Sequence, residues 1–381
     1  MGHWSVGHWG AGHWRIVTSY DLVIVGAGIV GAACADYASA ENLRVAVVES
    51  GPIGGGATAA AMGHLVAMDD DPAELALAHY SLGLWEAFVD LPQAEYSRCG
   101  TLWVAANADD YARIPAKLAR LAAAGVTAER VDAEQLYRLE PALAAGLAGG
   151  MLVPNEAVVY PPAVARYLVD RAVARGATLF PQRAYQLNSS GVRLSDGTKL
   201  CGNVLVATGC ALPQLLPQLP MRGRKGHLVI TDRFPGLVNH QLLELGYADS
   251  AHGDADSSVA FNVQPRPTGQ ILIGSSREYG SQSAEISMSM VRRMVSRTLQ
   301  FLPALSELEA IRIWTGFRPV SVDGLPYLGK VSQHANVWVA AGHEGLGVTT
   351  ALGSARLVID QLLGRTPAID PRPYDPARVG P

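Results

Sequence analysis

Apolar runs and helical periodicities alternate along most of the chain, and residues 20–49 form the clearest unit. An apolar, β-branched run, "YDLVIVGAG", precedes small residues with helical spacing, and "LRVAVVES" returns to an apolar run. Continuous apolar runs of this kind are typical of strands buried on both faces of a sheet. The pattern therefore predicts a strand, a helix and a second strand that ends at Glu49.

Further strands and helices follow in the middle and near the end of the chain. The periodicity predicts helices at residues 72–91, 109–124 and 162–175, with the strand "TLWVAAN" between the first two. "GATLF" and "NVLVATG" then have the character of buried strands. "ANVWVAAG" is another such strand, and a Gly-rich turn leads from it into a long helix, "GVTTALGSARLVIDQLLG". The Pro-rich tail beyond is predicted to be irregular.

A different pattern is inserted between these parallel-type strands. "GHLVITDR", "SVAFNVQP", "GQILIGSSRE" and "IRIWTGF" are predicted strands, "QPRPTGQ" is a predicted hairpin connection, and residues 288–302 form a predicted helix. We therefore expect an α/β protein in which a Rossmann-like, glutathione-reductase-like nucleotide-binding domain carries an inserted α+β substrate domain built on an antiparallel sheet. The expected boundaries are 20–80, 145–222 and 318–366 for the first domain, 81–144 and 223–317 for the second, 1–19 for an extension and 367–381 for the tail.

Composition and charge exclude several functional classes. The chain has 381 residues, of which 49% are hydrophobic and 17% charged, as expected for a globular protein of about two domains. A formal net charge of -4 without a basic stripe argues against a nucleic-acid partner. The apolar runs are broken well short of the roughly 20 residues of a membrane-spanning helix. We expect a cytoplasmic protein, or one peripheral to the inner membrane.

The cysteines and the N-terminal histidines are the obvious candidates for metal chemistry. Cys34, Cys99, Cys201 and Cys210 form no C-x-x-C pair, and their spacing supports neither a zinc nor an iron–sulfur site. They are expected to be small buried hydrophobes in a reducing compartment. Three Gly-His-Trp triplets in "MGHWSVGHWGAGHWR" suit a metal-binding tract or an unstructured extension, and we favour the extension.

A glycine-rich turn follows the first predicted strand. "GAGIVG" places Gly26, Gly28 and Gly31 at G-x-G-x-x-G spacing. The first glycine permits a tight turn, the second lets the backbone approach a pyrophosphate, and the third lets the helix pack close to the strand. Phosphates would lie at the helix N-terminus, and Glu49 lies where an acid binds a ribose hydroxyl. Together these elements predict a dinucleotide site.

Three features favour FAD as the dinucleotide. The fingerprint occurs once, so no separate NAD(P)H site is evident, and "GPIGGGATAAAMGHL" has small residues that let the backbone approach a large flat group. A second Gly-rich turn, "AAGHEGLGVTTALG", precedes a helix whose N-terminus would stabilise negative charge at the N1/C2=O edge of a flavin. The further cofactor-binding residues that we expect are Ser50, Ala57, Thr58, Gly63, Gly209, Gly345, Leu346, Gly347, Val348 and Thr349.

These motifs, taken together, resemble the FAD-dependent D-amino-acid oxidase/glycine oxidase family from about residue 20 onward. Within the family, "GHLVAMDD" makes the chain most similar to bacterial D-hydroxyproline dehydrogenases. The matching segments are "DLVIVGAGIVGAACA", "VVES", "GGGATAAAMGHL", "GTLWVA", "LEPAL", "VLVATG", "GQILIGSSRE", "GFRPVSVDGLPYLG" and "GHEGLGVTTALG".

Arg318 is the leading candidate for substrate binding. A permanent cation near a core needs a planar anion. From the residues alone, this anion could be a structural carboxylate or the carboxylate of a substrate. The resemblance implies the carboxylate of the substrate. It also places Asn262 where glycine oxidase-like members often carry a Tyr. His64 could contact substrate or help the amine lose its proton, or be structural. Tyr247 and Trp314 could line the pocket or belong to the core.

Two further histidines could have purely structural roles. His343 could pack on the flavin or merely begin the turn before the helix, and His227 is expected to serve the sheet. The covalent flavin positions of related enzymes are unmatched, because "ATAAAM" has no His and no Cys is near Arg318 in the sequence. FAD is therefore expected to be bound non-covalently.

The resemblance implies oxidation of a D-amino or D-imino acid, foremost cis-4-hydroxy-D-proline or D-proline, to the corresponding 1-pyrroline-2-carboxylate by hydride transfer to flavin N5. Two alternatives stay open. The chain could be a glycine or sarcosine oxidase that uses dioxygen, or the flavin-binding subunit of a larger complex that is inactive alone. The electron acceptor (a quinone, a dye, a partner subunit or dioxygen) and the oligomeric state stay undetermined at this point.

Overall fold

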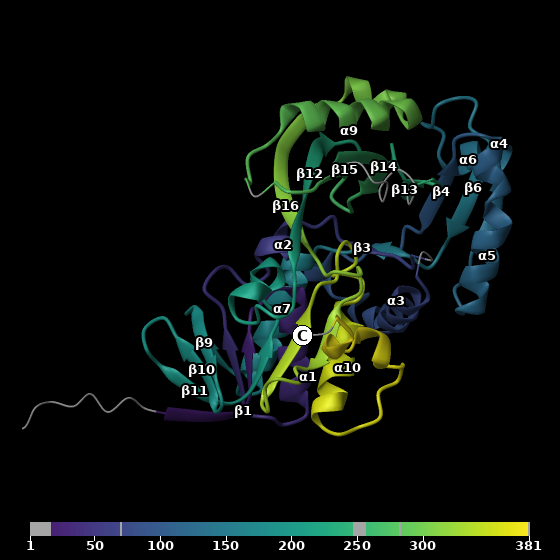
Figure 1. Cartoon of the computed structure of the whole chain (residues 1–381). Helices are drawn as coiled ribbons and strands as arrows, with labels where there is room; N and C mark the ends of the chain where they lie inside the picture. Colours follow the sequence, from purple (N-terminus) through teal and green to yellow (C-terminus); the bar gives the residue numbers. More distant parts are fainter. Residues whose placement is uncertain (1–16, 69–70, 247–256, 282, 380–381) are drawn as a thin grey trace, which may run out of the picture.

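The computed structural model describes residues 17–68, 71–246, 257–281 and 283–379. The Gly-His-Trp triplets and Tyr247 lie outside these residues. Within them the chain forms two eight-stranded sheets and one two-stranded sheet. Figure 1 shows the first large sheet in the lower half of the view with helices α1, α7 and α10, and the second in the upper half beneath α9.

The first sheet is mainly parallel. Its strands run in the order β17-β18-β11-β1-β2-β8, with the hairpin of β9 and β10 added beside β11. β17 pairs antiparallel with β18, whereas β18, β11, β1, β2 and β8 are mutually parallel. Its strands are β1 (Val17–Val25), β2 (Val45–Val48), β8 (Thr178–Phe180), β9 (Ala184–Asn188), β10 (Gly191–Leu194), β11 (Lys199–Val206), β17 (Tyr327–Lys330) and β18 (Val337–Ala341).

Burial on both faces explains the unbroken apolar runs of this sheet. In β1, Leu22 and Ile24 join the core beneath the helices, whereas Val23 and Val25 join a separate core on the opposite face. Helices α1 (Ile29–Ala40), α7 (Pro161–Ala174) and α10 (Ala351–Leu362) cover the first face. The small residues of α1 allow α7 and α10 to approach it closely.

The second sheet is mainly antiparallel, and its order is β16-β12-β15-β14-β13-β4-β6-β5. Only one neighbouring pair, β13 and β4, is parallel among the described strands of this sheet. Its strands are β4 (Thr101–Ala105), β5 (Glu129–Asp132), β6 (Gly149–Val153), β12 (Arg222–Arg233), β13 (Gln241–Glu244), β14 (Ser257–Pro265), β15 (Gln270–Glu278) and β16 (Ala310–Val320).

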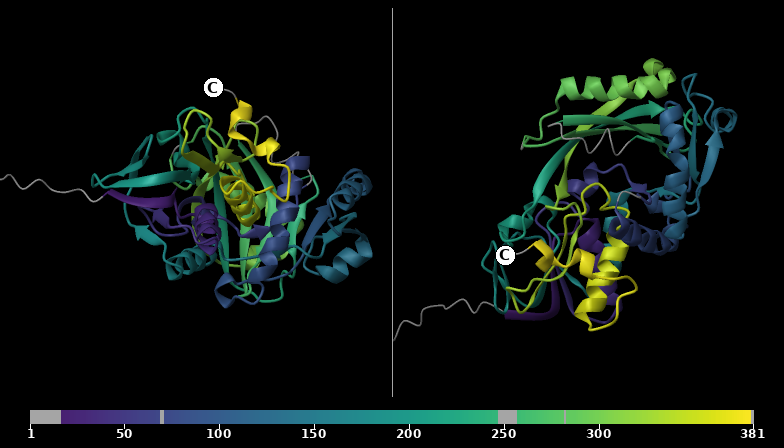
Figure 2. Two further views of the ribbon diagram at one scale, coloured as in Figure 1. Left: turned by 90° about the horizontal axis from the view of Figure 1, so that it is seen from below. Right: turned by 45° about the vertical axis from the view of Figure 1, so that its right-hand side comes forward.

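Helix α9 (Met288–Phe301) covers the outer face of the second sheet. Phe261 and Val263 of β14 point into this core, where the rings of Phe261 and Phe301 stack with centroids 4.3 Å apart. In the right-hand view of Figure 2, α9 lies above the strands and α10 lies at the opposite end of the molecule. The two sheets and their helices confirm the predicted α/β class with an inserted antiparallel part.

The remaining elements are a small third sheet and further helices. β3 (His64–Leu65) pairs antiparallel with β7 (Ala157–Val158) in the small third sheet. The other helices are α2 (Gly56–Ala60), α3 (Pro72–Trp85), α4 (Ala108–Ala112), α5 (Ile114–Ala123) and α6 (Ala133–Leu139). The 3-10 helices are η1 (Glu86–Phe88), η2 (Pro92–Ala94), η3 (Gly209–Gln214), η4 (Pro303–Glu307), η5 (Arg372–Tyr374) and η6 (Pro376–Val379).

Several predicted element bounds were wrong. The helix predicted at 72–91 ends at Trp85 and continues only as a 3-10 turn. The helix predicted at 109–124 is two helices, α4 and α5, because Pro115 lacks the N–H that a continuous helix needs and instead lies in the first turn of α5. The C-terminal tail is not irregular throughout, since Tyr374 is 1% exposed and its hydroxyl donates to the Ala73 carbonyl at 2.6 Å.

The expected domain boundaries also differ from the sheet membership. β1 begins at Val17, inside the range assigned to the extension, and pairs there with Lys199. β6 falls in the range assigned to the nucleotide-binding domain but is hydrogen-bonded to β4 and β5 in the second sheet. Short edge strands such as β5 and β6 are hard to assign from sequence because their alternation spans too few residues.

We expect Gly31→Ala to lower the free energy of unfolding by about 1–3 kcal/mol, because a Cβ there would lie 2.0 Å from the Gly26 carbonyl oxygen. Gly83→Ala, in the last turn of α3 where an added Cβ would meet nothing within 4 Å, is the matched control. It should raise stability by roughly 0.5–1 kcal/mol. Urea unfolding followed by circular dichroism measures both. A Gly31→Ala protein as stable as the wild type would contradict the close helix–strand approach.

Candidate active site

A cavity of about 730 Å³ extends from the carboxyl ends of β1 and β2 to the inner face of the second sheet. Ligands of open α/β sheets bind at this end of the strands. Fifteen of the residues predicted from sequence line the cavity. Most lie in turns that follow strands of the first sheet, whereas Asn262 and Arg318 lie in strands of the second. The fifteen residues are Gly26, Gly28, Glu49, Ser50, Ala57, Thr58, Gly63, His64, Gly209, Asn262, Arg318, Gly345, Leu346, Gly347 and Val348.

The glycine fingerprint has the geometry that its spacing predicts. Gly26 has a φ of +106°, and a Cβ there would lie 2.4 Å from the Ala207 carbonyl oxygen. Gly31 does not line the cavity, because it lies where α1 packs against the Gly26 turn. Gly28 caps α1 without a side-chain hydrogen bond, and the first turn of the helix carries no acidic residue. This helix N-terminus can therefore receive an anion.

Glu49 and Thr58 close the turn around the helix start. The Glu49 carboxylate accepts from the backbone N–H of Ala27 at 2.8 Å and of Gly51 at 2.7 Å. A carboxylate has about four lone-pair positions, so it retains capacity for ribose hydroxyls. The Thr58 hydroxyl accepts from Ile29 N–H at 3.0 Å, so this side chain fastens α2 to the start of α1.

The second Gly-rich turn lies next to Arg318, since a Cβ on Gly345 would lie 4.0 Å from its Cδ. The Glu344 N–H donates to the Pro319 carbonyl at 2.9 Å, and the Glu344 carboxylate pairs with Arg224. Regular helix starts only at Ala351, one turn later than the sequence predicted. The N–H groups of Gly345 and its neighbours therefore precede the helix proper.

Thr349 does not line the cavity and instead links three elements behind it. Its hydroxyl donates to the His64 carbonyl at 2.9 Å and accepts from Val66 N–H at 3.2 Å. Its carbonyl accepts from the Ser81 hydroxyl at 2.6 Å and from Trp85 Nε1 at 2.9 Å. Thr349 thus positions β3 and joins α3 to the start of α10. The end of α3, from residue 81 onward, therefore packs on the nucleotide-binding domain, although it was predicted to belong to the substrate domain.

Arg318 lies on the inner face of the second sheet, near the end of β16. Its Nη1 donates to the Ser276 carbonyl at 3.1 Å, across the intervening strand β12. Gly226 of β12 makes this possible, because a Cβ there would lie 2.5 Å from Nη1. The side chain therefore lies flat over β12 and lines the cavity.

Several buried polar atoms in the cavity wall have no hydrogen-bond partner among the described residues. His64 Nε2, Asn262 Oδ1 and Thr208 Oγ1 are among them. Leaving such atoms unsatisfied costs about 1–3 kcal/mol each, so their presence indicates that a ligand completes them. Burial lowers the pKa of His64 to about 4, so its imidazole is neutral at physiological pH.

His343 and His227 have structural partners. His343 Nε2 lies 2.9 Å from the Ser354 hydroxyl, and burial lowers its pKa to about 4, although the residue also lines the cavity. The His227 ring contacts the Ser276 hydroxyl and accepts from Ser287 N–H at 3.0 Å, so it serves the sheet as predicted.

The structure places Trp314 outside the cavity lining and leaves three of the four cysteines at least partly exposed. Trp314 is not among the lining residues, and its Nε1 donates weakly to the Ala60 carbonyl at 3.4 Å. Of the four cysteines only Cys34 is buried, which corrects the expectation of four buried thiols. Cys210 is exposed, lines the cavity and lies 3.5 Å from the Phe317 carbonyl oxygen. Burial of its sulfur raises the pKa of the thiol to about 11, which keeps it protonated.

Sequence reasoning missed Arg277 and Ser275, which line the cavity from β15. Strand alternation places Ser275 and Arg277 on one face of β15, but it does not say from the sequence alone that this face meets the cavity. The described part of the chain contains no group of three or more His, Cys, Asp or Glu that could hold a metal ion. Among the described helices, none has the length and hydropathy required to span a membrane.

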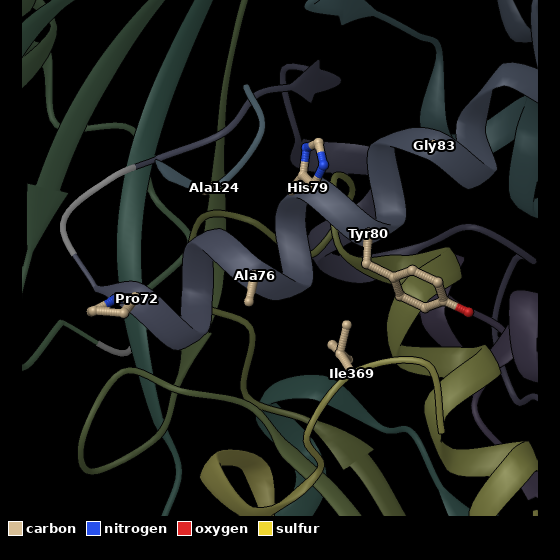
Figure 3. A pocket seen from close by; sticks show the side chains of 7 residues that line it. All are labelled: Pro72, Ala76, His79, Tyr80, Gly83, Ala124 and Ile369. Carbon is tan, nitrogen blue, oxygen red and sulfur yellow. The ribbon is translucent and has the colours of Figure 1, made fainter. Parts of the chain in front are cut away.

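A second, more open hollow of about 460 Å³ lies on the outside of α3. Figure 3 shows Ala76 and Tyr80 directed toward Ile369, whereas His79 points to the opposite side of the helix. Its remaining lining residues are Pro72, Gly83 and Ala124. It contains none of the residues that the motifs predict, so the larger cavity is the candidate active site.

A parallel sheet with a glycine fingerprint, an acid after the second strand and a second Gly-rich turn facing one cavity defines a dinucleotide-binding oxidoreductase fold. The chain belongs to the family described as FAD dependent oxidoreductase, whose model matches residues 21–361. FAD is therefore its cofactor, and the close-approach glycines and unsatisfied wall atoms fit such a group.

Curated relatives cover nearly the whole chain. Glycine oxidase of Pseudomonas aeruginosa is 29% identical over 93% of this chain and 98% of its own length. Hydrogen cyanide synthase subunit HcnC of the same species is 26% identical over 95% of this chain and 97% of its own length.

Solved structures share the fold. Glycine oxidase from Geobacillus kaustophilus matches with a TM-score of 0.85 and 25% identity, covering 95% of this chain and 99% of that one. L-proline dehydrogenase from P. horikoshii matches with a TM-score of 0.84 and 19% identity, covering 96% and 98%, and this likeness concerns the fold alone.

His64→Asn should weaken the loss of stability in acid. Because the folded-state pKa of about 4 lies below the usual 6.5, His64 destabilises the fold as pH falls from about 6.5 toward 4. At pH 5 this amounts to about 2 kcal/mol, which the Asn variant should not show. Urea unfolding of the flavoprotein at pH 7.5 and pH 5 measures the difference. His79→Asn, an exposed control on α3, should behave as the wild type, and an unchanged pH dependence in His64→Asn would contradict the buried imidazole.

Proposed function

We propose that the chain oxidises an amino or imino acid, most specifically cis-4-hydroxy-D-proline or D-proline, to the corresponding 1-pyrroline-2-carboxylate. The observation that carries the proposal is that Arg318 lines the same cavity as the glycine fingerprint. A guanidinium there can hold a carboxylate through paired hydrogen bonds while the rest of the molecule points into the cavity. The bound FAD supplies the hydride acceptor, at its N5 atom.

The chain's own residues then bind and orient the substrate. Arg318 fixes the carboxylate, and its contact with the Ser276 carbonyl fixes the guanidinium in turn. Asn262 offers an amide whose Oδ1 can accept from the substrate amine. His64 offers a neutral Nε2 at the cavity wall, which can accept a hydrogen bond from the substrate amine. Positioning of this kind supplies much of the rate.

Arg318→Ala should reduce kcat/KM for cis-4-hydroxy-D-proline by roughly 100-fold or more, because a charge-assisted pair to the carboxylate is lost. Arg318→Lys should recover part of that loss, since an ammonium keeps the charge but not the planar fork. Anaerobic mixing, followed by bleaching of the flavin band, measures the rate. Arg312→Ala, an exposed arginine earlier on the same strand, is the control. Wild-type rates in Arg318→Ala with FAD still bound would sink the assignment.

A glycine or sarcosine oxidase that uses dioxygen is the second candidate, and the similarity to glycine oxidases favours it. The same anaerobic experiment with glycine and sarcosine separates the two substrate classes. Adding dioxygen or a quinone to the bleached protein then shows which acceptor restores the flavin band. Rapid return with dioxygen supports an oxidase, and return only with the quinone supports a dehydrogenase.

The similarity to a hydrogen cyanide synthase subunit supports a third possibility, that the chain acts with partner subunits. We propose a cytoplasmic location, or one at the inner membrane beside the acceptor, under either reading. The isolated chain and the chain co-expressed with candidate partner subunits can be compared. Flavin bleaching that occurs only in the co-expressed complex would favour a role as a subunit.

A further inference from the structure

Arg277 is a second arginine in the cavity wall, and the proposed reaction does not account for it. It is 5% exposed and lines the same cavity as Arg318. An arginine stays charged at any physiological pH, and burying it is costly unless its donors are used. With five N–H donors, a guanidinium that is already bonded within the protein still has donors to offer a ligand.

Strand alternation directs Arg277 toward the cavity. On β15, Ser275 and Arg277 line the cavity, whereas the hydroxyl of Ser276 between them contacts His227 on the opposite side. Lys225 of β12 pairs in register with Glu278 of β15. The next residue pair inward therefore brings Arg277 beside Gly226, on the face that looks into the cavity.

The same glycine brings Arg318 close from the other side. Lys225 also pairs in register with Phe317 of β16, so Arg318 and Arg277 flank β12 from its two neighbours. Arg318 lies across Gly226 and donates to the Ser276 carbonyl, one residue from Arg277. Two permanent cations are thus brought to one end of the cavity, where they repel each other unless acceptor oxygens lie between or beside them.

The protein's nearby carboxylate Glu344 is already engaged. It also lines the cavity, but it is paired with Arg224 and accepts from Gly345 N–H. Asn262 extends the polar row to β14, because it pairs in register with Gly274 of β15. Polar groups therefore form a row across the strands from β16 to β14, in which neighbouring strands are about 4.8 Å apart. A molecule as small as glycine, with its carboxylate at Arg318, cannot span this row.

We propose that Arg277 binds a second acceptor oxygen of the substrate, beyond the carboxylate held by Arg318. The substrate is then an amino or imino acid with a distal hydroxyl or a second carboxylate, which share the chemistry that a guanidinium recognises. This inference rests on the proposed function of Arg318. Arg277 sets specificity and takes no part in the oxidation itself.

Two matched substrate pairs test the proposal by anaerobic flavin bleaching. cis-4-Hydroxy-D-proline differs from D-proline by one hydroxyl, and iminodiacetate differs from sarcosine by one carboxylate. We expect kcat/KM of the wild type to favour the acceptor-bearing member of at least one pair by about tenfold or more. In Arg277→Met, which keeps a long apolar stem, the preference should fall to within about threefold while the simpler member reacts at nearly the wild-type rate.

Further variants separate specificity from structure. Arg277→Lys should retain part of the preference for a carboxylate because it keeps the charge. Arg293→Met removes an exposed arginine of α9 that donates to Ser257 at the start of β14, and it should keep the full wild-type preference. The pair that loses its preference in Arg277→Met identifies the group as hydroxyl or carboxylate. Equal slowing of both members, or no preference in the wild type, would overturn the proposal.

Failure of the proposed function can be told apart from failure of this inference. If no amine bleaches the flavin, the oxidation of these substrates is wrong. The role of Arg277 is then tested by glutarate and butyrate, which bind without reacting and shift the flavin spectrum. A tighter dissociation constant for glutarate, lost in Arg277→Met, supports a second acceptor site. Equal binding of the two acids by the wild type, or a preference that survives in the variant, overturns it.

Discussion

The pairing of β12 with β16 is the constraint on which the candidate site depends. These long strands hydrogen-bond from Arg222 and Val320 to Thr231 and Ala310, so they carry the second sheet down to the nucleotide-binding part. At its end β16 meets the turn before α10, where Val320 bridges His343. Arg318 therefore has a fixed place relative to the Gly-rich turn, so one continuous ladder positions the proposed substrate anchor relative to the proposed flavin edge.

The cavity wall is energetically expensive in the form described. Unsatisfied buried atoms such as His64 Nε2 and Asn262 Oδ1 each cost on the order of 1–3 kcal/mol, and close-approach glycines add backbone entropy to the cost of folding. Binding of the cofactor and the substrate offsets this free-energy cost, because ligands that bind the folded state stabilise it. Active sites often lower the stability of the fold in exchange for function. In this protein, part of that cost lies on the inner face of the second sheet, which carries Asn262.

Much of this arrangement follows from sequence, for physical reasons that differ between its parts. The βαβ unit and Gly26, Gly28 and Glu49 were predictable because buried strands and tight turns impose strict residue types. The break between α4 and α5 was readable from Pro115 but overlooked. Arg277 was not found because strand alternation identifies a cavity face only once the sheet order is known. The docking of Tyr374 was hidden because nothing local marks a contact with a residue three hundred positions away.

Alternation along β14 has a consequence for how this protein can change. Phe261 and Val263 pack beneath α9, whereas Asn262 between them lines the cavity, so the packed face and the cavity face are opposite sides of one strand. A substitution on the cavity side leaves the packing under α9 in place. Descendants of such a chain can therefore explore new substrates by single steps without first losing the fold, which is one physical route by which a scaffold acquires many activities.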